Sequence, residues 1–170
     1  MITSTSSSQV KHVVNLQKKA KLRKEEKQFV VEGVKMVSEA PADRLVKVYV
    51  SETFKADNEE FLERMNYDSI GKDVLEIVTD NVFMRMADTQ TPQGIMAVVR
   101  MSDTDLEGIL SDKRNPLLLI IENLQDPGNL GTIVRMAEGA GVTGIIMSSN
   151  TVDIYNPKTI RSTMGSLYRV

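Results

Sequence analysis

The chain has 170 residues, of which 41% are hydrophobic and 26% charged, and its net charge at pH 7 is -2. That length holds one full domain of an ordinary globular protein, or one domain and part of a second. The lack of cysteine excludes disulfides, thiol nucleophiles and thiolate metal sites, and a single histidine, His12, argues against a Ser-His-Asp triad or a histidine metal site. No apolar run approaches the roughly 20 residues that span a bilayer, and no signal-peptide pattern opens the chain. We therefore expect no membrane segment and a cytoplasmic location.

The N-terminal segment is strongly basic. After residues 1–8, which we expect to be a mobile tail, Ser8 is a candidate cap for a helix with Val10, Val13 and Leu16 on one face. Residues 1–28 carry seven Lys or Arg against Glu25 and Glu26, a net charge of +5 in a mildly acidic protein. A local basic patch suggests an anionic partner such as a phosphate backbone, with a solvated helix face as the alternative. The candidate RNA contacts here are Lys18, Lys19, Arg23 and Lys24.

Strand and helix patterns then alternate to residue 100. Strands are predicted at residues 29–33, 45–51, 74–79 and 94–100, and helices at 34–40, 58–65 and 80–88, the last capped by Asp80. This alternation predicts an α/β layer structure with a largely parallel sheet, and we assign residues 1–100 to the first domain. The stretch Thr91-Pro92-Gln93-Gly94 is a turn that starts the last strand, with RNA contact as the alternative.

A second α/β unit follows a polar connector at residues 101–115. The apolar run "LLLIIENL" predicts a strand buried on both faces, followed by a helix at about 129–138, a strand near 142–149 and a helix after Pro157. The closing residues, "SLYRV", are apolar and strand-like. Two strands and two helices do not complete an α/β domain, so we expect the domain that begins at residue 116 to continue beyond Val170.

Two interpretations compete for the glycines around the helix at 129–138. Gly139 to Gly144 match the dinucleotide pattern G-x-G-x-x-G, but they follow the helix, whereas a dinucleotide fold needs them between strand and helix. The strand-to-helix junction at residues 122–129 is instead the expected ligand edge, with Glu122 after the strand and Asn129 as a candidate N-cap. Arg135 lies about 240° around the helix from Asn129, so the two edge a groove without sharing a face.

The segment "IIENLQDPGNLGTIVRMAEGAGV" (residues 120–142) closely resembles the first motif of the SpoU (TrmH-type) RNA ribose 2′-O-methyltransferases of the SPOUT superfamily. "YNPKTIRSTMGSLYRV" resembles the next stretch of that family, and "FVVEGVKMVSEA" with "MADTQTPQGIMAVV" resembles its N-terminal, L30e-like substrate-binding domain. The resemblance covers residues 9–170. It implies an α/β fold, namely an L30e-like α/β/α sandwich followed by the first part of a SPOUT-type trefoil-knot domain.

The resemblance also implies an activity, the transfer of a methyl group from S-adenosylmethionine to a ribose 2′-hydroxyl of rRNA, or less favourably of tRNA, by a homodimer. It implies catalytic roles for Arg135 and Asn129, RNA contacts at Arg161 and Ser162, and at most a place near the cofactor for Glu122. Because the later knot motifs supply most of the cofactor pocket, we expect these 170 residues alone to be inactive. A guanidinium normally stays charged, so Arg135 is either an unusual base or a clamp on phosphate and alkoxide. The alternative function is a non-catalytic RNA-binding module of L30e-like type.

Overall fold

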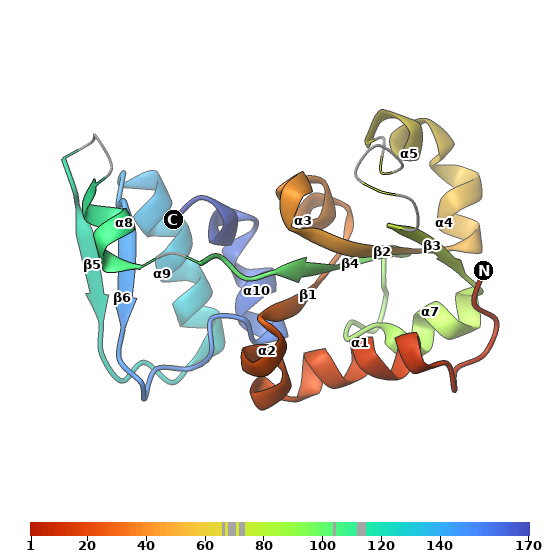
Figure 1. Cartoon of the computed structure of the whole chain (residues 1–170), viewed down its shortest axis with the longest axis horizontal. Coiled ribbons are helices and arrows are strands. Elements are labelled where there is room, and N and C mark those ends of the chain that lie inside the picture. The colour runs from red at the N-terminus through yellow and green to blue at the C-terminus, as the bar shows by residue number, and fades with distance from the viewer. Residues whose placement is uncertain (66, 68–70, 72–73, 104, 112–114) are drawn as a thin grey trace. The chain divides into compact units, whose positions relative to one another are not determined.

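The computed structural model describes residues 1–65, 67, 71, 74–103, 105–111 and 115–170. It divides into two compact units, Met1–Met101 and Ser102–Val170, and each is described by itself. Figure 1 gives the element labels, with the chain coloured from its N-terminus to its C-terminus.

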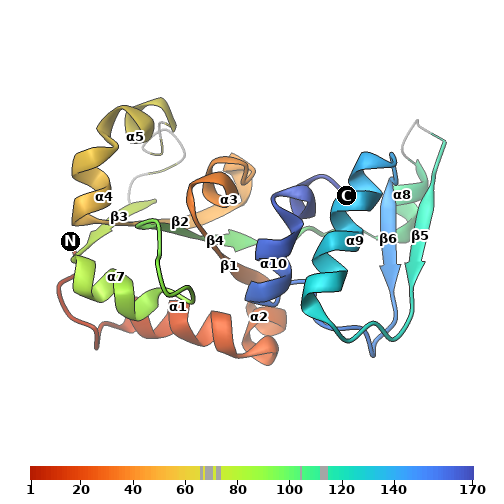
Figure 2. The ribbon, with the colours of Figure 1, turned by 180° about the vertical axis from the view of Figure 1, so that it is seen from behind.

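The first unit is a four-stranded sheet between two helical layers. Its strands are β1 (Gln28–Glu32), β2 (Leu45–Ser51), β3 (Leu75–Val78) and β4 (Ile95–Arg100), in the order β1-β4-β2-β3. One layer holds α1 (Ser8–Lys18) and α7 (Asp80–Met86), and the other holds α3 (Val34–Ser38), α4 (Glu52–Asp57) and α5 (Glu59–Met65), as Figures 1 and 2 show. Two short elements, α2 (Ala20–Glu26) and the 3-10 turn η1 (Ala42–Arg44), complete the described parts of this unit. The expected sandwich of mixed α and β elements is confirmed.

Strand direction differs from the expectation of a largely parallel sheet. Strands β2 and β3 are parallel, but β4 is antiparallel to both β1 and β2. The connection at residues 87–94 brings the chain back to the edge where β2 ends, and there Ser51 N donates to the carbonyl of Gly94 at 2.9 Å. Strand β4 therefore runs back through the sheet, and the prediction of a mostly parallel sheet was wrong for this unit.

The start of the chain is attached to the sheet. Ile2 forms a parallel bridge with Val78, and its backbone N donates to the carbonyl of Ile77 at 2.8 Å. The terminal amine lies 3.0 Å from a carboxylate oxygen of Glu76. The residues expected to form a mobile tail thus begin with an extension of the sheet.

The second unit contains α8 (Leu106–Ser111), β5 (Leu118–Ile121), α9 (Pro127–Gly139), β6 (Gly144–Met147), α10 (Pro157–Thr163) and the 3-10 turn η2 (Ser166–Tyr168). Strands β5 and β6 are parallel, and helix α9 packs on the face that carries Ile121. Ile120 points away from that face and is 73% exposed, so the prediction of a strand buried on both faces was wrong. The closing residues form the turn η2, whereas the sequence predicted a strand there.

Candidate functional site

Helix α9 begins two residues earlier than expected, and Asp126 is its cap. The Asp126 side chain accepts a hydrogen bond from the backbone N of Asn129 at 2.6 Å, and Pro127 occupies the first helical turn, where its missing N–H costs nothing. The prediction that Asn129 caps this helix was therefore wrong. Because Asp126 takes that role, the exposed side-chain amide of Asn129 is not used to terminate the helix.

The loop that leads into α9 is cross-braced to the loop that follows β6. Asn123, at a left-handed φ of 54°, donates its backbone N to the Ser148 hydroxyl at 3.0 Å. Val152 N donates to the carbonyl of Leu124 at 2.8 Å, and the Gln125 side chain donates to the carbonyl of Asn150. These bonds join the segments after two parallel strands, the edge at which ligands bind in α/β sheets. Glu122 is exposed at the start of this edge.

Arg135 lies in the middle of α9 and is exposed. Within the part of the chain that the structure describes, its guanidinium makes no hydrogen bond or ion pair, in contrast to Arg169, which pairs with Glu138 on the same helix. The structure places Arg135 and Asn129 on one helix but does not bring them onto one face. A groove lined by both residues would therefore need a second wall from a segment other than α9.

Helices α9 and α10 cross with their backbones in close approach at Gly131. A Cβ at that position would lie 2.4 Å from the Cβ of Ser162 and 2.7 Å from the carbonyl oxygen of Thr159. The Ser162 hydroxyl donates back to the carbonyl of Lys158 at 2.9 Å. Ser162 therefore serves the helix crossing, while its neighbour Arg161 is partly buried in the last turn of α10.

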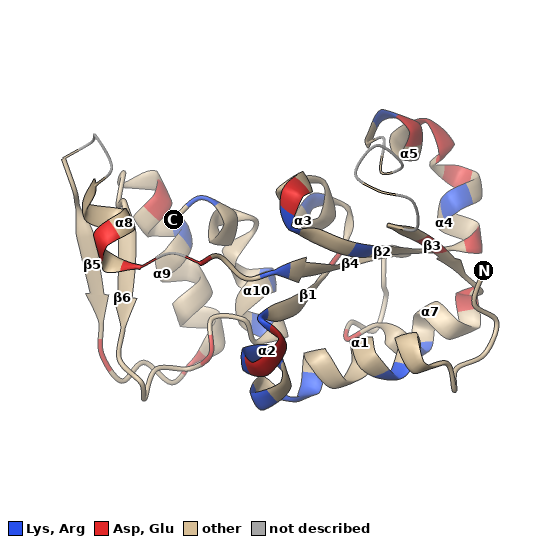
Figure 3. Cartoon of the chain, viewed as in Figure 1, with Lys and Arg blue, Asp and Glu red and all other residues tan. Residues whose placement is uncertain are grey.

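Four of the five basic residues predicted to contact RNA lie around the corner between α1 and α2. Lys18, Lys19 and Lys24 are exposed there, and Figure 3 shows the blue segments at this corner. Arg23 is only 3% exposed, and it donates to the carbonyls of Leu16 and Gln17 at 2.6 and 2.9 Å. It satisfies the last carbonyls of α1, a structural task, so the prediction that Arg23 contacts RNA is withdrawn.

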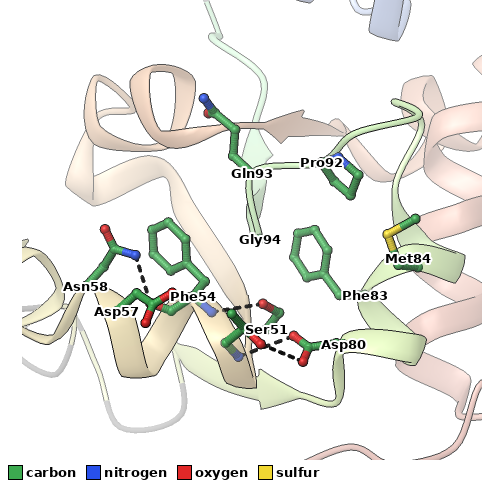
Figure 4. Close-up of a pocket in the computed structure, with 11 residues that line it drawn as sticks. Ser51, Phe54, Asp57, Asn58, Asp80, Phe83, Met84, Pro92, Gln93 and Gly94 are labelled. Atoms are coloured by element: carbon green, nitrogen blue, oxygen red, sulfur yellow. Dashed lines mark hydrogen bonds between the residues drawn. The ribbon is translucent and has the colours of Figure 1, made fainter.

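A pocket of about 340 Å³ opens in the first unit where β2 ends (Figure 4). Asp80 was predicted to cap α7, but Thr79 holds that position, and the Asp80 carboxylate accepts from Thr53, from Oγ1 at 2.7 Å and from the backbone N at 3.2 Å. Hydrogen bonds from Thr53 and then Ser51 lower the pKa of the Asp80 carboxyl. The sequence singled out only one part of this pocket, the turn at residues 91–94, because the rest of its lining comes from segments far apart in the chain.

The turn at residues 91–94 lies beside this pocket and also holds the start of α3. Gln93 accepts the backbone N–H of Val34 at 2.8 Å, next to Gly33 at a φ of 98°. Gly94 has a φ of 85°, and a Cβ there would lie 2.7 Å from the Cβ of Phe54. The segments "VEG" and "TPQG", which are far apart in the chain, therefore meet where Gln93 contacts the start of α3 beside Gly33.

No helix among the described residues is long and apolar enough to cross a membrane. No group of three or more His, Asp or Glu residues in the described ranges has the arrangement of a metal site.

Two family models match the chain. Residues 7–97 match the MRM3-like substrate binding domain, and residues 116–170 match the SpoU rRNA Methylase family. The chain is 32% identical to human mitochondrial rRNA methyltransferase 3 in an alignment of 167 positions that covers 93% of the chain and 37% of the human protein. It is 34% identical to an uncharacterized tRNA/rRNA methyltransferase of Synechocystis in an alignment of 174 positions that covers 97% of the chain and 58% of that protein.

The fold has a close counterpart in a solved structure. AdoMet-bound rRNA methyltransferase from Sinorhizobium meliloti matches with a TM-score of 0.81 at 24% identity, covering 99% of the chain and 62% of that structure. At this identity the likeness establishes the fold alone. The chain thus spans a little over a third of the human relative's length and under two thirds of the solved structure.

Proposed function

Because the chain belongs to the SpoU rRNA methylase family and carries an MRM3-like substrate-binding domain, we propose that it serves the transfer of a methyl group from S-adenosylmethionine to a ribose 2′-hydroxyl of rRNA. The observation that carries the proposal is the Asp126-capped helix α9, which begins at the carboxyl edge of β5 and β6 with Asn129 in its first turn and carries the exposed Arg135 in its middle. Ribosomal RNA is favoured over tRNA because the human relative is named for it, while the Synechocystis relative is named for both.

Arg135 is proposed to act as a clamp. The reaction would join the 2′-oxygen to the methyl carbon as the bond from that carbon to sulfur breaks with its electrons going to sulfur, and the hydroxyl proton would pass to water. A guanidinium keeps its charge and binds phosphate oxygens in bidentate fashion, so an exposed Arg135 is suited to hold the adjacent phosphate and to stabilise the oxygen as it loses its proton. Asn129 would orient the ribose through its free side-chain amide.

We propose that the described residues of this chain form only part of a cofactor site. Several polar groups after β5 and β6 form hydrogen bonds with one another, as between Asn123 and Ser148 and between Gln125 and Asn150. Glu122 is exposed, and nothing encloses an adenosine or methionine group around it in the described residues. S-adenosylmethionine, which supplies the methyl group, is therefore proposed to be held mainly by residues outside this sequence.

RNA is proposed to reach the protein through cations. Lys18, Lys19 and Lys24 form an exposed basic corner in the first unit, and Arg161 lies near the end of α10 in the second. Phosphate contacts of this kind give affinity without sequence preference and weaken as salt rises. Ser162 is proposed to pack beside such a phosphate contact and not to make one, because its hydroxyl donates to a carbonyl within its own helix.

A homodimer is proposed to complete the site. Arg135 and Asn129 do not share a face, so an arginine offered to a second copy explains its position. Met136, next to it, is 68% exposed, an apolar group suited to an interface. The cytoplasm remains our proposed location, and the human relative is by its name mitochondrial.

The test is methyl transfer from tritiated S-adenosylmethionine to rRNA, measured for the 170-residue chain and for any longer polypeptide that contains it. We expect label in a nucleotide whose 3′ linkage resists alkali, because a methylated 2′-oxygen cannot attack the neighbouring phosphate. Label in a base would contradict the proposal. RNA binding without transfer by every such polypeptide would instead favour the non-catalytic module.

A further inference from the structure

The pocket of the first unit has a mixed lining that the proposed function does not use. It lies where β2 ends, where α7 begins and where the turn at residues 91–94 leads into β4. Figure 4 shows Phe54 and Phe83 flanking Gly94, with Pro92 and Met84 on one side and Ser51 and Asp80 below. Phe54 and Phe83 are 6% and 2% exposed, so they contribute a closed base to the pocket.

The rim offers an apolar surface that the described residues of the unit leave exposed. Met84 is 54% exposed although it borders this pocket, and Pro92 lies beside it. A flexible thioether and a proline ring are suited to contact the aliphatic stem or flat face of an entering side chain.

The polar lining consists chiefly of acceptors held in place by the protein. Both oxygens of Asp80 are fixed by Thr53, and the Asn58 amide nitrogen donates to the carbonyl of Phe54 at 3.0 Å, which fixes that side chain as well. Asp57 adds a second carboxylate. Among the described residues that line the pocket none is Lys or Arg.

The surroundings extend this negative charge. Residues 52–65, which include α4 and α5, hold five carboxylates against two cations, a net charge of -3, and Figure 3 shows more red than blue on these helices. Charges act over about 8–10 Å at physiological salt, so a phosphate group near the pocket would be repelled and a cation attracted. The charge argues against an RNA backbone here and for a positively charged ligand.

We propose that this pocket binds an arginine side chain of a basic protein partner. The guanidinium would donate to the Asp80 carboxylate and to the acceptors at Asp57 and Asn58, while its stem lies along Met84 and Pro92. Arginine fits better than lysine because its planar fork presents several donors in fixed directions and stacks on flat surfaces. The site is separate from the basic corner proposed for RNA, so one unit would hold RNA and a basic protein at different places.

The experiment is an NMR titration of the ¹⁵N-labelled chain with two peptides, acetyl-Gly-Arg-Gly-amide and its citrulline counterpart. Citrulline has nearly the shape of arginine without its charge. We expect saturable shifts at the amides of Thr53, Asp80 and Gly94 with the arginine peptide, and at least about tenfold weaker binding of the citrulline peptide, because a hydrogen bond between charged groups is lost.

Asp80→Asn should also weaken arginine binding at least about tenfold, and Asn can still accept from Thr53. The matched control is Glu59→Gln, which removes the same charge from the acidic surface but not from the pocket, and it should change binding less than twofold. Met84→Ala is a second variant, expected to weaken binding about threefold by removing the stem contact.

Four results would overturn the inference. Equal binding of both peptides, or equal loss in Asp80→Asn and Glu59→Gln, would leave only general attraction to an acidic surface. Cytidine that binds these same amides more tightly than the arginine peptide would assign the pocket to a nucleobase. Self-association of the unmodified chain that Asp80→Asn abolishes would assign it to a second copy. RNA methylation is measured independently of these titrations, so either proposal can fail without the other.

Discussion

At the scale of single residues, Arg135 carries the most direct test of chemistry. Arg135→Lys keeps the charge but loses the bidentate fork, so we expect kcat/KM for rRNA methylation to fall about 10²- to 10³-fold in a polypeptide that is active. Arg85→Lys, the same change at an exposed position of α7, should leave the rate unaltered. If Arg135 is a clamp, the residual activity keeps the pH dependence of the parent enzyme. A changed pH profile would make it the base, and an unchanged rate would remove it from the site.

Two buried tyrosines predict a loss of stability in alkali. Burial, and for Tyr49 secondarily the charge of Glu76, raises the pKa of Tyr49 and of Tyr67 from 10.0 to about 12. The two tyrosine hydroxyls ionise near pH 10 in the unfolded chain but only near pH 12 in the folded chain. Their contribution to the free energy of unfolding is therefore complete below pH 10 and is lost as pH rises towards 12. Tyr67→Phe should therefore lose less unfolding free energy than the parent chain between pH 8 and pH 11, measured by urea denaturation at both values. Parallel losses would contradict the assignment.

The burial of Arg23 could not be predicted from the charge of its segment. A run of Lys and Arg predicts that a segment is basic, and Lys18, Lys19 and Lys24 are indeed exposed. The run does not reveal which member turns inward, because that depends on where α1 ends and leaves carbonyls without partners. The Asp126 cap was missed for a related reason, since Asp126 and Asn129 are both good caps and only the geometry of Pro127 decides between them.

At the scale of elements, the crossing of α9 and α10 depends on one glycine. Gly131→Ala would place a Cβ within 3 Å of Ser162 and Thr159 and force the helices apart, so we expect about 1–3 kcal/mol of destabilisation in urea denaturation. Gly139→Ala at the end of the same helix meets nothing within 4 Å and should be neutral or slightly stabilising, since Ala is the better helix former. Equal effects of the two changes would show that the crossing is not tight.

Periodicity predicted most of the described elements but not their directions. The four strands of the first unit and the helices α3, α7, α9 and α10 lie close to the predicted ranges, because their apolar spacing is local information. The antiparallel β4 and the exposed face of β5 depend on how connections and neighbouring layers are arranged, which no short window contains. Helix α4 was missed because Phe54 is the one buried residue among its six, so no apolar spacing marks it.

At the scale of the whole molecule, the order of the units follows from sequence, while the pocket does not. The motifs "VEG", "TPQG" and "DPGN" mark the family in chain order, and the family models match the same two regions. The pocket needs Ser51, Asp80 and Gly94 together, and only the sheet brings these three positions to one edge. Long-range assembly is therefore where the structure adds most to function.

The separation of the two cores predicts that the first unit folds by itself. One of its buried clusters, from Val10 to Val98, lies wholly within Met1–Met101, and the backbone bond from Met101 N to the carbonyl of Lys27 closes inside the same range. The second unit rests on a smaller cluster around Leu130 and leaves Ile120 exposed. A fragment of residues 1–101 should therefore unfold cooperatively in urea, followed by circular dichroism, with a smaller m-value than the whole chain because less surface is exposed. Gly131→Ala in the whole chain should leave the transition of this unit unmoved. A fragment without a cooperative transition would mean that the first core needs residues beyond Met101.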